Sequence, residues 1–169
     1  MPKSATFYLI RHAEKPTQPE DPRLTLAGEA RAQAYVAYFR HLGLNSSSHL
    51  IAAADSEHSC RSRLTLTPLS QALSLPIDAT VADHDYPRLS ERLLGDARFD
   101  QRSTLVCWHH GQILGLAQSL GAKSDQLPAA WPDAVFGWLI TLRYDGNSHL
   151  EEVRVDNQKL MFGDGGVSP

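Results

Sequence analysis

The sequence has few cysteines, and the two that it has form no recognisable motif. Cys60 and Cys107 are the only cysteines in 169 residues, and they match neither a zinc-binding nor a redox spacing. Both lie in segments that read as the start or the interior of a regular element, so we expect buried free thiols. Nothing in the sequence therefore demands an oxidising compartment.

The sequence also lacks an excess of positive charge and a long apolar run. It has 16 Lys and Arg against 19 Asp and Glu, a formal net charge of −3. Phosphate-backbone binding usually needs a strong basic patch, so we expect no nucleic-acid partner. The apolar stretch ATFYLI at residues 5–10 ends at Arg11, which is too short for a membrane span and unlike a signal peptide. We therefore expect no membrane partner and a cytoplasmic location.

The composition is that of a soluble globular protein, with 42% hydrophobic and 21% charged residues. A chain of 169 residues is long enough to bury one substantial core. We predict a single domain over residues 1–169, with the final GDGGVSP, at about 163–169, forming a flexible tail.

Apolar runs alternate with helix-like segments along most of the chain. Strands are predicted at 5–10, 49–54 and 103–108, and helices at 25–41, 60–73, about 88–98 and 111–121. Thr25 can cap the first helix and Gly43 can end it, whereas Pro68 predicts a kink or a late start in the second. Such an alternation predicts an α/β domain with a mostly parallel central sheet.

Near the end of the chain the pattern changes to two consecutive strands. Residues 135–144 and 149–155 read as strands, and the turn residues Asp145-Gly146-Asn147 separate them. This spacing is typical of an antiparallel hairpin.

Polar side chains follow three of the predicted strands. The first runs into Arg11-His12, the second into Asp55-Ser56 with Arg61 and Arg63 shortly after, and the third into His109-His110-Gly111. Ligands of open α/β sheets bind at the carboxyl ends of the strands, so we expect these groups to meet in one site.

These residue types favour chemistry on an anion. His12 could be a hydrogen-bonded histidine at a strand end, but a neutral imidazole beside an arginine could also act as a nucleophile or a base. Arg61 and Arg63 point to different faces of a helix, so only one should reach the site. A metal site built from Asp83-His84-Asp85 and the paired histidines is a further interpretation, although no helix-spaced histidine pair supports it.

Four segments in order resemble the histidine phosphatase superfamily, the phosphoglycerate mutase-like phosphatases. They are LIRHAEK, LTLAGEARAQA, CRSRLTLTPLSQAL and LVCWHHGQI, and together they extend over roughly residues 5–121. The ordered combination is much more specific than any one of them. The resemblance implies a three-layer α/β sandwich with a mostly parallel sheet and a site that needs no metal and no cofactor.

The resemblance also implies a role for individual residues. His12 would be the nucleophile that forms a phosphohistidine, and Arg11 would bind the phosphoryl group. Arg61, four residues before Thr65, would be a second phosphate clamp. His110, followed by a glycine as in the family, would bind the phosphoryl group and stabilise its transfer, since clustered cations suit the charge on the transferring oxygens.

This sequence departs from the family at several positions. Ala13 replaces the usual glycine, and Glu57 stands where a serine is common, with Ser56 one residue away. The double histidine leaves His109 as an alternative to His110.

The general acid and the rim of the site are less well marked in the sequence. Asp85 and Glu91 are both candidates for the general acid. Glu14, Lys15 and His109 are candidates for the substrate rim, and Glu14 and Lys15 could also be a simple surface pair.

We therefore expect a metal-independent phosphatase that acts on a phosphoester or a protein phosphohistidine through a phosphohistidine intermediate. Its partner would be a phosphorylated small molecule or a phosphoprotein. A phosphoglycerate-type mutase, a non-catalytic phosphate-binding module of the same fold, and a metal hydrolase are the alternatives.

Overall fold

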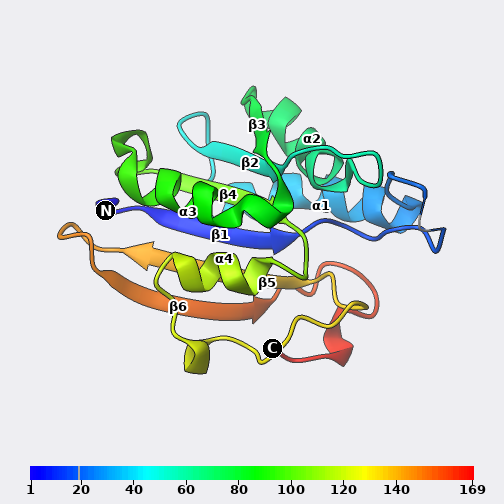
Figure 1. Cartoon of the computed structure of the whole chain (residues 1–169). Helices are drawn as coiled ribbons and strands as arrows, with labels where there is room; N and C mark the ends of the chain where they lie inside the picture. Colours follow the sequence, from blue (N-terminus) through cyan, green and yellow to red (C-terminus); the bar gives the residue numbers. More distant parts are fainter. Residues whose placement is uncertain (19) are drawn as a thin grey trace.

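The computed structural model describes residues 1–18 and 20–169. A six-stranded sheet with the order β3-β2-β4-β1-β5-β6 runs through the molecule (Figure 1). The strands are β1 (Thr6–Arg11), β2 (His49–Ala53), β3 (Ile77–Val81), β4 (Ser103–Trp108), β5 (Trp138–Tyr144) and β6 (Leu150–Asn157). The helices are α1 (Leu26–His41), α2 (Arg61–Leu73), α3 (Tyr86–Gly95) and α4 (Ile113–Ser119), with short 3₁₀ turns at Asp83–Asp85, Ala97–Phe99, Ser124–Gln126 and Asp164–Gly166.

The sheet is mostly parallel, as predicted. Strand β4 pairs in parallel with both β1 and β2, and β2 pairs in parallel with β3. Strand β5 is antiparallel to both β1 and β6, so the last two strands form the expected hairpin at one edge. The carboxyl ends of β1, β2, β3 and β4 therefore lie at the same end of the sheet.

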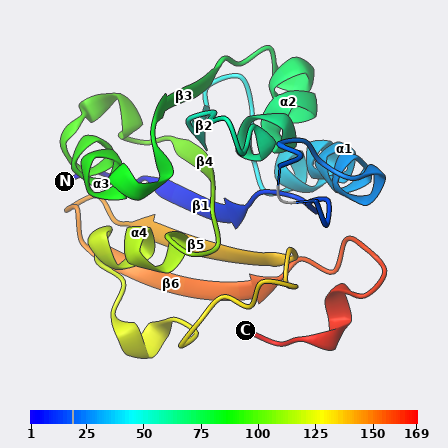
Figure 2. The same cartoon turned by 45° about the vertical axis from the view of Figure 1, so that its right-hand side comes forward.

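Helices cover both faces of the sheet and make three layers (Figures 1 and 2). Alternation along a strand sends successive side chains to opposite faces. On one face, Tyr8 and Ile10 pack with Tyr35 and Phe39 of α1 and with residues of α2. On the other face, apolar side chains of the same strands pack against α3 and α4. The predicted three-layer α/β sandwich is confirmed.

Local sequence explains why α1 begins where it does. Thr25 is the N-cap, and its side chain accepts a hydrogen bond from the Gly28 N–H. Gly28 also lies directly against the segment that follows β1, because a Cβ at this position would come within 2.6 Å of the Glu14 carbonyl oxygen. The glycine of LTLAGEA thus allows α1 to pack closely beside the residues after His12.

The structure corrects several predicted boundaries. Helix α2 begins at Arg61 and continues through Pro68, so there is no late start. Strand β3 lies in a region where no strand was predicted, although IDATV alternates apolar and polar residues over its five positions. Helix α4 is shorter than expected and begins at Ile113.

The end of the chain also differs from the flexible tail that we expected at 163–169. Residues Asp164–Gly166 form a 3₁₀ turn, and the Asp164 carboxylate makes two hydrogen bonds of 3.0 and 2.7 Å to Arg31 of α1. Its Oδ2 also accepts the backbone N–H groups of Leu160 and Met161. A buried ion pair thus anchors this segment.

A search for membrane-spanning helices among the residues that the structure describes finds none of sufficient length and apolarity.

Candidate active site

The pairing of β1 with β4 brings two histidines together at the carboxyl end of the sheet. Arg11 is the register partner of Trp108, and the next N–H along the chain, that of His12, donates to the Trp108 carbonyl. His12 and His109 therefore leave adjacent strands side by side. Their ring centroids are 5.2 Å apart in an edge-to-face arrangement.

The His12 ring is fixed in the form that a nucleophile requires. His12 is only 2% exposed, and its Nδ1 lies 2.8 Å from the Ala13 carbonyl oxygen. Because a carbonyl only accepts, Nδ1 carries the proton and Nε2 keeps its lone pair. Burial, followed by the nearby charge of Arg11, outweighs the Ala13 hydrogen bond and lowers the pKa of His12 to about 2. The ring is therefore neutral at physiological pH.

His109, and not His110, lies against the ring of His12. Its Nδ1 is 4.0 Å from Oδ2 of Asp83. Burial lowers the pKa of His109, and the positive charges of Arg61 and Arg11 lower it further, whereas Asp83 raises it. We expected His110 in this position and His109 at the rim, but in the structure His109 lies against His12 and His110 lies beside Asp133. Sequence spacing could not separate two adjacent residues in a turn.

Arg11 is fully buried beside His12. Its Nη1 donates to the backbone carbonyls of Pro132, Asp133 and Val135 at 3.4, 2.5 and 3.0 Å. Its guanidinium carbon lies 3.9 Å from the centre of the Phe136 ring, a cation–π distance. Burial lowers the pKa of Arg11 to about 10, so the group stays charged at neutral pH. The segment 132–136 thus fixes the orientation of the Arg11 side chain, which we predicted to bind phosphate.

Helix α2 begins with Arg61, and Thr65 ties it to the segment that follows His12. The Thr65 hydroxyl accepts from the Ala13 N–H at 2.9 Å and donates to the Arg61 carbonyl at 2.8 Å. Arg61 Nη1 donates to the Asp21 carbonyl, and its Nε is buried and has no hydrogen-bond partner among the described residues. Arg63 turns away and pairs with Asp55 at 2.6 Å. As predicted, the two arginines lie on different faces of α2.

Three polar side chains form an outer rim around Asp133. Lys15 Nζ lies 2.8 Å, His110 Nε2 3.3 Å and Arg11 Nη2 3.3 Å from the same carboxylate oxygen, Oδ1. Hydrogen bonding from Lys15 lowers the pKa of Asp133, and burial opposes this only in part. Sequence reasoning missed Asp133, because an aspartate in the predicted loop 122–134 carried no motif.

Neither predicted general acid contacts the inner site in the described part of the chain. Asp85 is 3.9 Å from Arg88 of the same segment, and Glu91 is an exposed residue of α3. Asp83 is the carboxylate that approaches His109, with its Oδ2 4.0 Å from Nδ1 of that ring, and the sequence marked it only as a candidate metal ligand. Its position comes from the turn before α3, where its carbonyl accepts the Trp108 indole N–H at 3.0 Å.

Glu14 is neither a rim residue nor half of a surface pair. Its carboxylate accepts hydrogen bonds from Nε and Nη2 of Arg31, the shortest at 2.7 Å. The Arg31 side chain is 2% exposed, and it also binds Asp164. The ion pair therefore joins the segment after His12 to α1 and to the end of the chain.

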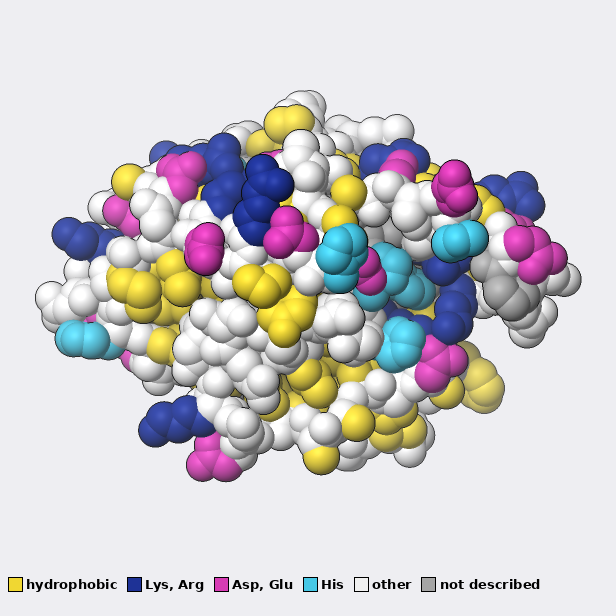
Figure 3. Space-filling view, in the orientation of Figure 1, with side chains coloured by type: hydrophobic (Ala, Val, Ile, Leu, Met, Phe, Trp, Pro, Cys, Tyr) yellow, Lys and Arg dark blue, Asp and Glu magenta, His cyan; other side chains and the backbone are white. Residues whose placement is uncertain are grey.

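Histidine, basic and acidic side chains gather around this end of the sheet on one face of the molecule (Figure 3). Within residues 1–18 and 20–169, no group of three His, Cys, Asp or Glu side chains has an arrangement that could hold a metal ion. The cluster is instead built from arginines and histidines around His12.

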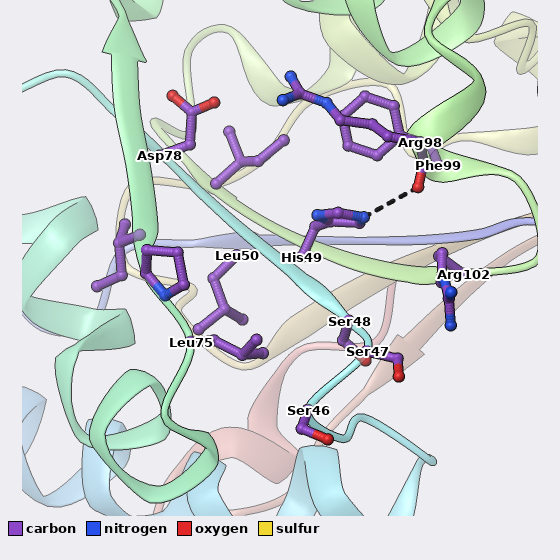
Figure 4. Close-up of a pocket in the computed structure, with 13 residues that line it drawn as sticks. Ser46, Ser47, Ser48, His49, Leu50, Leu75, Asp78, Arg98, Phe99 and Arg102 are labelled. Atoms are coloured by element: carbon purple, nitrogen blue, oxygen red, sulfur yellow. Dashed lines mark hydrogen bonds between the residues drawn. The ribbon is translucent and has the colours of Figure 1, made fainter.

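A cavity of about 620 Å³ lies at the opposite end of the sheet (Figure 4). Its lining includes residues at the amino ends of β2 and β3. His49 Nε2 is bound to the Arg98 carbonyl there, and the Arg98 side chain pairs with Asp96. These polar groups are already satisfied by the protein, so size alone does not make this cavity the active site.

Solved structures of other proteins have the same fold as this chain. No family model and no curated protein sequence matches this chain. A structure of the protein histidine phosphatase SixA complexed with tungstate matches with a TM-score of 0.63 and 14% identity, over 90% of this chain and 97% of that chain. A structure of a mycobacterial glucosyl-3-phosphoglycerate phosphatase with inorganic phosphate matches with a TM-score of 0.57 and 16% identity, over 90% of this chain and 95% of that chain.

A phosphoglycerate mutase from Plasmodium falciparum matches with a TM-score of 0.53 and 14% identity, over 97% of this chain and 93% of that chain. The chain therefore has the fold of these two phosphatases and this mutase, which is the fold that the ordered motifs predicted.

Proposed function

We propose that this chain is a metal-independent phosphatase that hydrolyses a phosphoester or a protein phosphohistidine through a phosphohistidine at His12. The observation that carries the proposal is the state of His12. Its Nδ1 proton is committed to the Ala13 carbonyl, so Nε2 offers a lone pair beside the charged Arg11. The fold and its likeness to solved structures of phosphatases support this proposal.

The residues present can account for both steps of such a reaction. In the first step, Nε2 of His12 forms a bond to phosphorus while the bond to the leaving group breaks, and the leaving group takes up a proton from solvent water. In the second step, water attacks the phosphohistidine, the N–P bond breaks, and inorganic phosphate leaves. Arg11 and Arg61 supply fixed positive charge for the transferring oxygens.

His109 is the candidate for the proton transfer of the second step. His109 touches His12, and its lowered pKa leaves it neutral at pH 7 and able to accept a proton from water in the second step. Neither predicted general acid, Asp85 or Glu91, contacts the inner site within residues 1–18 and 20–169. This favours substrates whose leaving group needs little acid catalysis, as in the P–N bond of phosphohistidine.

A mutase is the second candidate. The mutase alignment covers 93% of that chain, so the compactness of this protein does not separate the two activities. Transfer of the phosphoryl group to a second hydroxyl would then replace hydrolysis, with the same residue at the centre.

We expect the purified chain to release inorganic phosphate from a phosphohistidine peptide and, more slowly, from p-nitrophenyl phosphate, with EDTA having no effect. Phosphate release is measured with both of these substrates, and isomerisation is measured with 3-phosphoglycerate. Together the two assays distinguish a phosphatase from a mutase. Isomerisation without release would establish the mutase, and loss of activity in EDTA would establish a metal hydrolase. Phosphate binding without turnover of any substrate would establish a non-catalytic module.

A further inference from the structure

The rim of the site holds one carboxylate oxygen in an unusual position. Oδ1 of Asp133 is within 3.3 Å of Arg11 Nη2, Lys15 Nζ and His110 Nε2. These three groups come from the end of β1, the segment after His12 and the turn after β4. Donors that converge on one point from three parts of the chain form a site for an oxyanion oxygen.

The orientation of Arg11 shows which edge of its guanidinium faces this point. Nη1 is fully used by the backbone carbonyls of Pro132, Asp133 and Val135. Nη2 binds the Asp133 carboxylate, and Nε is buried and has no partner in the described part of the chain. The Nε–Nη2 edge is the one that binds phosphate in a bidentate manner, and here only half of it is occupied.

Lys15 also has capacity left. The ammonium group of Lys15 has three N–H donors, and the Asp133 carboxylate accepts from it at 2.8 Å. A carboxylate that presents one oxygen cannot satisfy all of these groups. A tetrahedral phosphoryl group presents three oxygens and can.

We propose that Asp133 is a resident counter-ion that occupies the position of one phosphoryl oxygen and that a substrate must displace it. This inference rests on the proposed function, and it makes Asp133 a residue that sets affinity and selectivity for the phosphoryl group. An anion with a single charge or only one free oxygen gains little from replacing the carboxylate. A dianionic phosphoryl group fills the empty half of the Arg11 edge and is selected.

The displacement requires only a side-chain rotation. The Asp133 side chain is 64% exposed, so it can turn into solvent. The Asp133 carbonyl stays on Arg11 Nη1 during this rotation, and the guanidinium therefore keeps its orientation. The lowered pKa of Asp133 also argues against a role as general acid, because the carboxyl group is ionised at neutral pH.

The test is the affinity of the full chain for inorganic phosphate, measured by isothermal titration calorimetry, in Asp133→Asn and Asp133→Ala. We expect both variants to bind phosphate roughly three- to tenfold more tightly than the unmodified protein. Asp55→Asn is the matched control for removal of one negative charge at the same end of the sheet, because Asp55 pairs with Arg63 and touches none of the three donors. Its phosphate affinity should change by less than about twofold.

Unchanged or weaker phosphate binding in both Asp133 variants would overturn the inference, since the carboxylate would then not compete with the anion. An equal gain in Asp55→Asn would also overturn it, because the effect would be one of overall charge. Binding needs no turnover, so the outcome is independent of the proposed function. If no substrate is hydrolysed and the Asp133 variants still bind phosphate more tightly, the proposed function fails and this inference stands.

Discussion

Replacing His12 by Asn should lower kcat/KM for phosphate release by about 10³-fold or more. The Asn side chain can still donate to the Ala13 carbonyl from a position near that of Nδ1. It has no atom with a lone pair in place of Nε2. The substitution therefore removes the proposed nucleophile while keeping the hydrogen bond that holds this segment. Steady-state kinetics with a phosphohistidine peptide measures the loss.

The matched control is His49→Asn, the same chemical change at the other end of the sheet. His49 contacts the Arg98 carbonyl and the Phe99 ring, far along β2 from the proposed site. Its kcat/KM should stay within about twofold of the unmodified protein. A His12→Asn protein that is folded, binds phosphate and retains more than about a tenth of the activity would contradict a nucleophilic role.

Replacing Arg31 by Met should lower the free energy of unfolding by about 3–5 kcal/mol, the cost of removing one partner from a buried ion pair. The Arg31 side chain is 2% exposed, and its partners Glu14 and Asp164 are 20% and 7% exposed. Methionine fills a similar volume but leaves two carboxylates without their cation. Urea unfolding followed by circular dichroism gives the difference directly.

Arg143→Met is the control for loss of a charged side chain at the surface. Arg143 pairs with Glu151 and Glu152 but is 52% exposed, so its replacement should cost about 1 kcal/mol or less. Equal effects of the two substitutions would contradict the view that the Arg31 cluster anchors the end of the chain.

The loss of unfolding free energy in Arg31→Met should also depend on pH. Burial raises the pKa of Asp164, but hydrogen bonds from Arg31 and from Met161 lower it more, so the folded-state pKa lies below the ordinary value of 3.8. A carboxyl group with a lowered pKa contributes stability above its unfolded pKa, and this contribution is lost as the pH falls through the folded pKa. The stability difference between the unmodified protein and Arg31→Met should therefore be full at pH 7 and shrink below about pH 4.

The sequence was sufficient for the fold because its signals there are local. Thr25 caps α1 with its own hydroxyl, and the apolar runs around Leu9 and Val106 are long enough to identify buried parallel strands. The rule that ligands bind at the carboxyl ends of strands then predicted that Arg11 and His12 lie at the same end of the sheet as the residues after β4, which is where the structure has them. Strand β3 was missed because four of its five residues are only partly buried or exposed.

The details of the site depend on contacts between distant residues, which no local pattern contains. Whether His109 or His110 faces His12 depends on the conformation of one turn. Glu14 and Asp164, which are 150 residues apart in the chain, share Arg31 as their ion-pair partner. Asp133 pairs with Arg11 because of the conformation of a loop whose sequence predicts only irregular structure. Side-chain types could therefore be predicted, but not these partners.

The most direct measurement of the central claim is the identification of the phosphorylated residue. The protein is mixed with a ³²P-labelled phosphohistidine peptide, quenched in base and digested, and the labelled peptide is mapped. The account predicts a label that is stable in base, labile in acid, located on His12 and missing in His12→Asn. Label on His109, His110 or any other residue, or turnover with no labelled protein at any time after mixing, would contradict it.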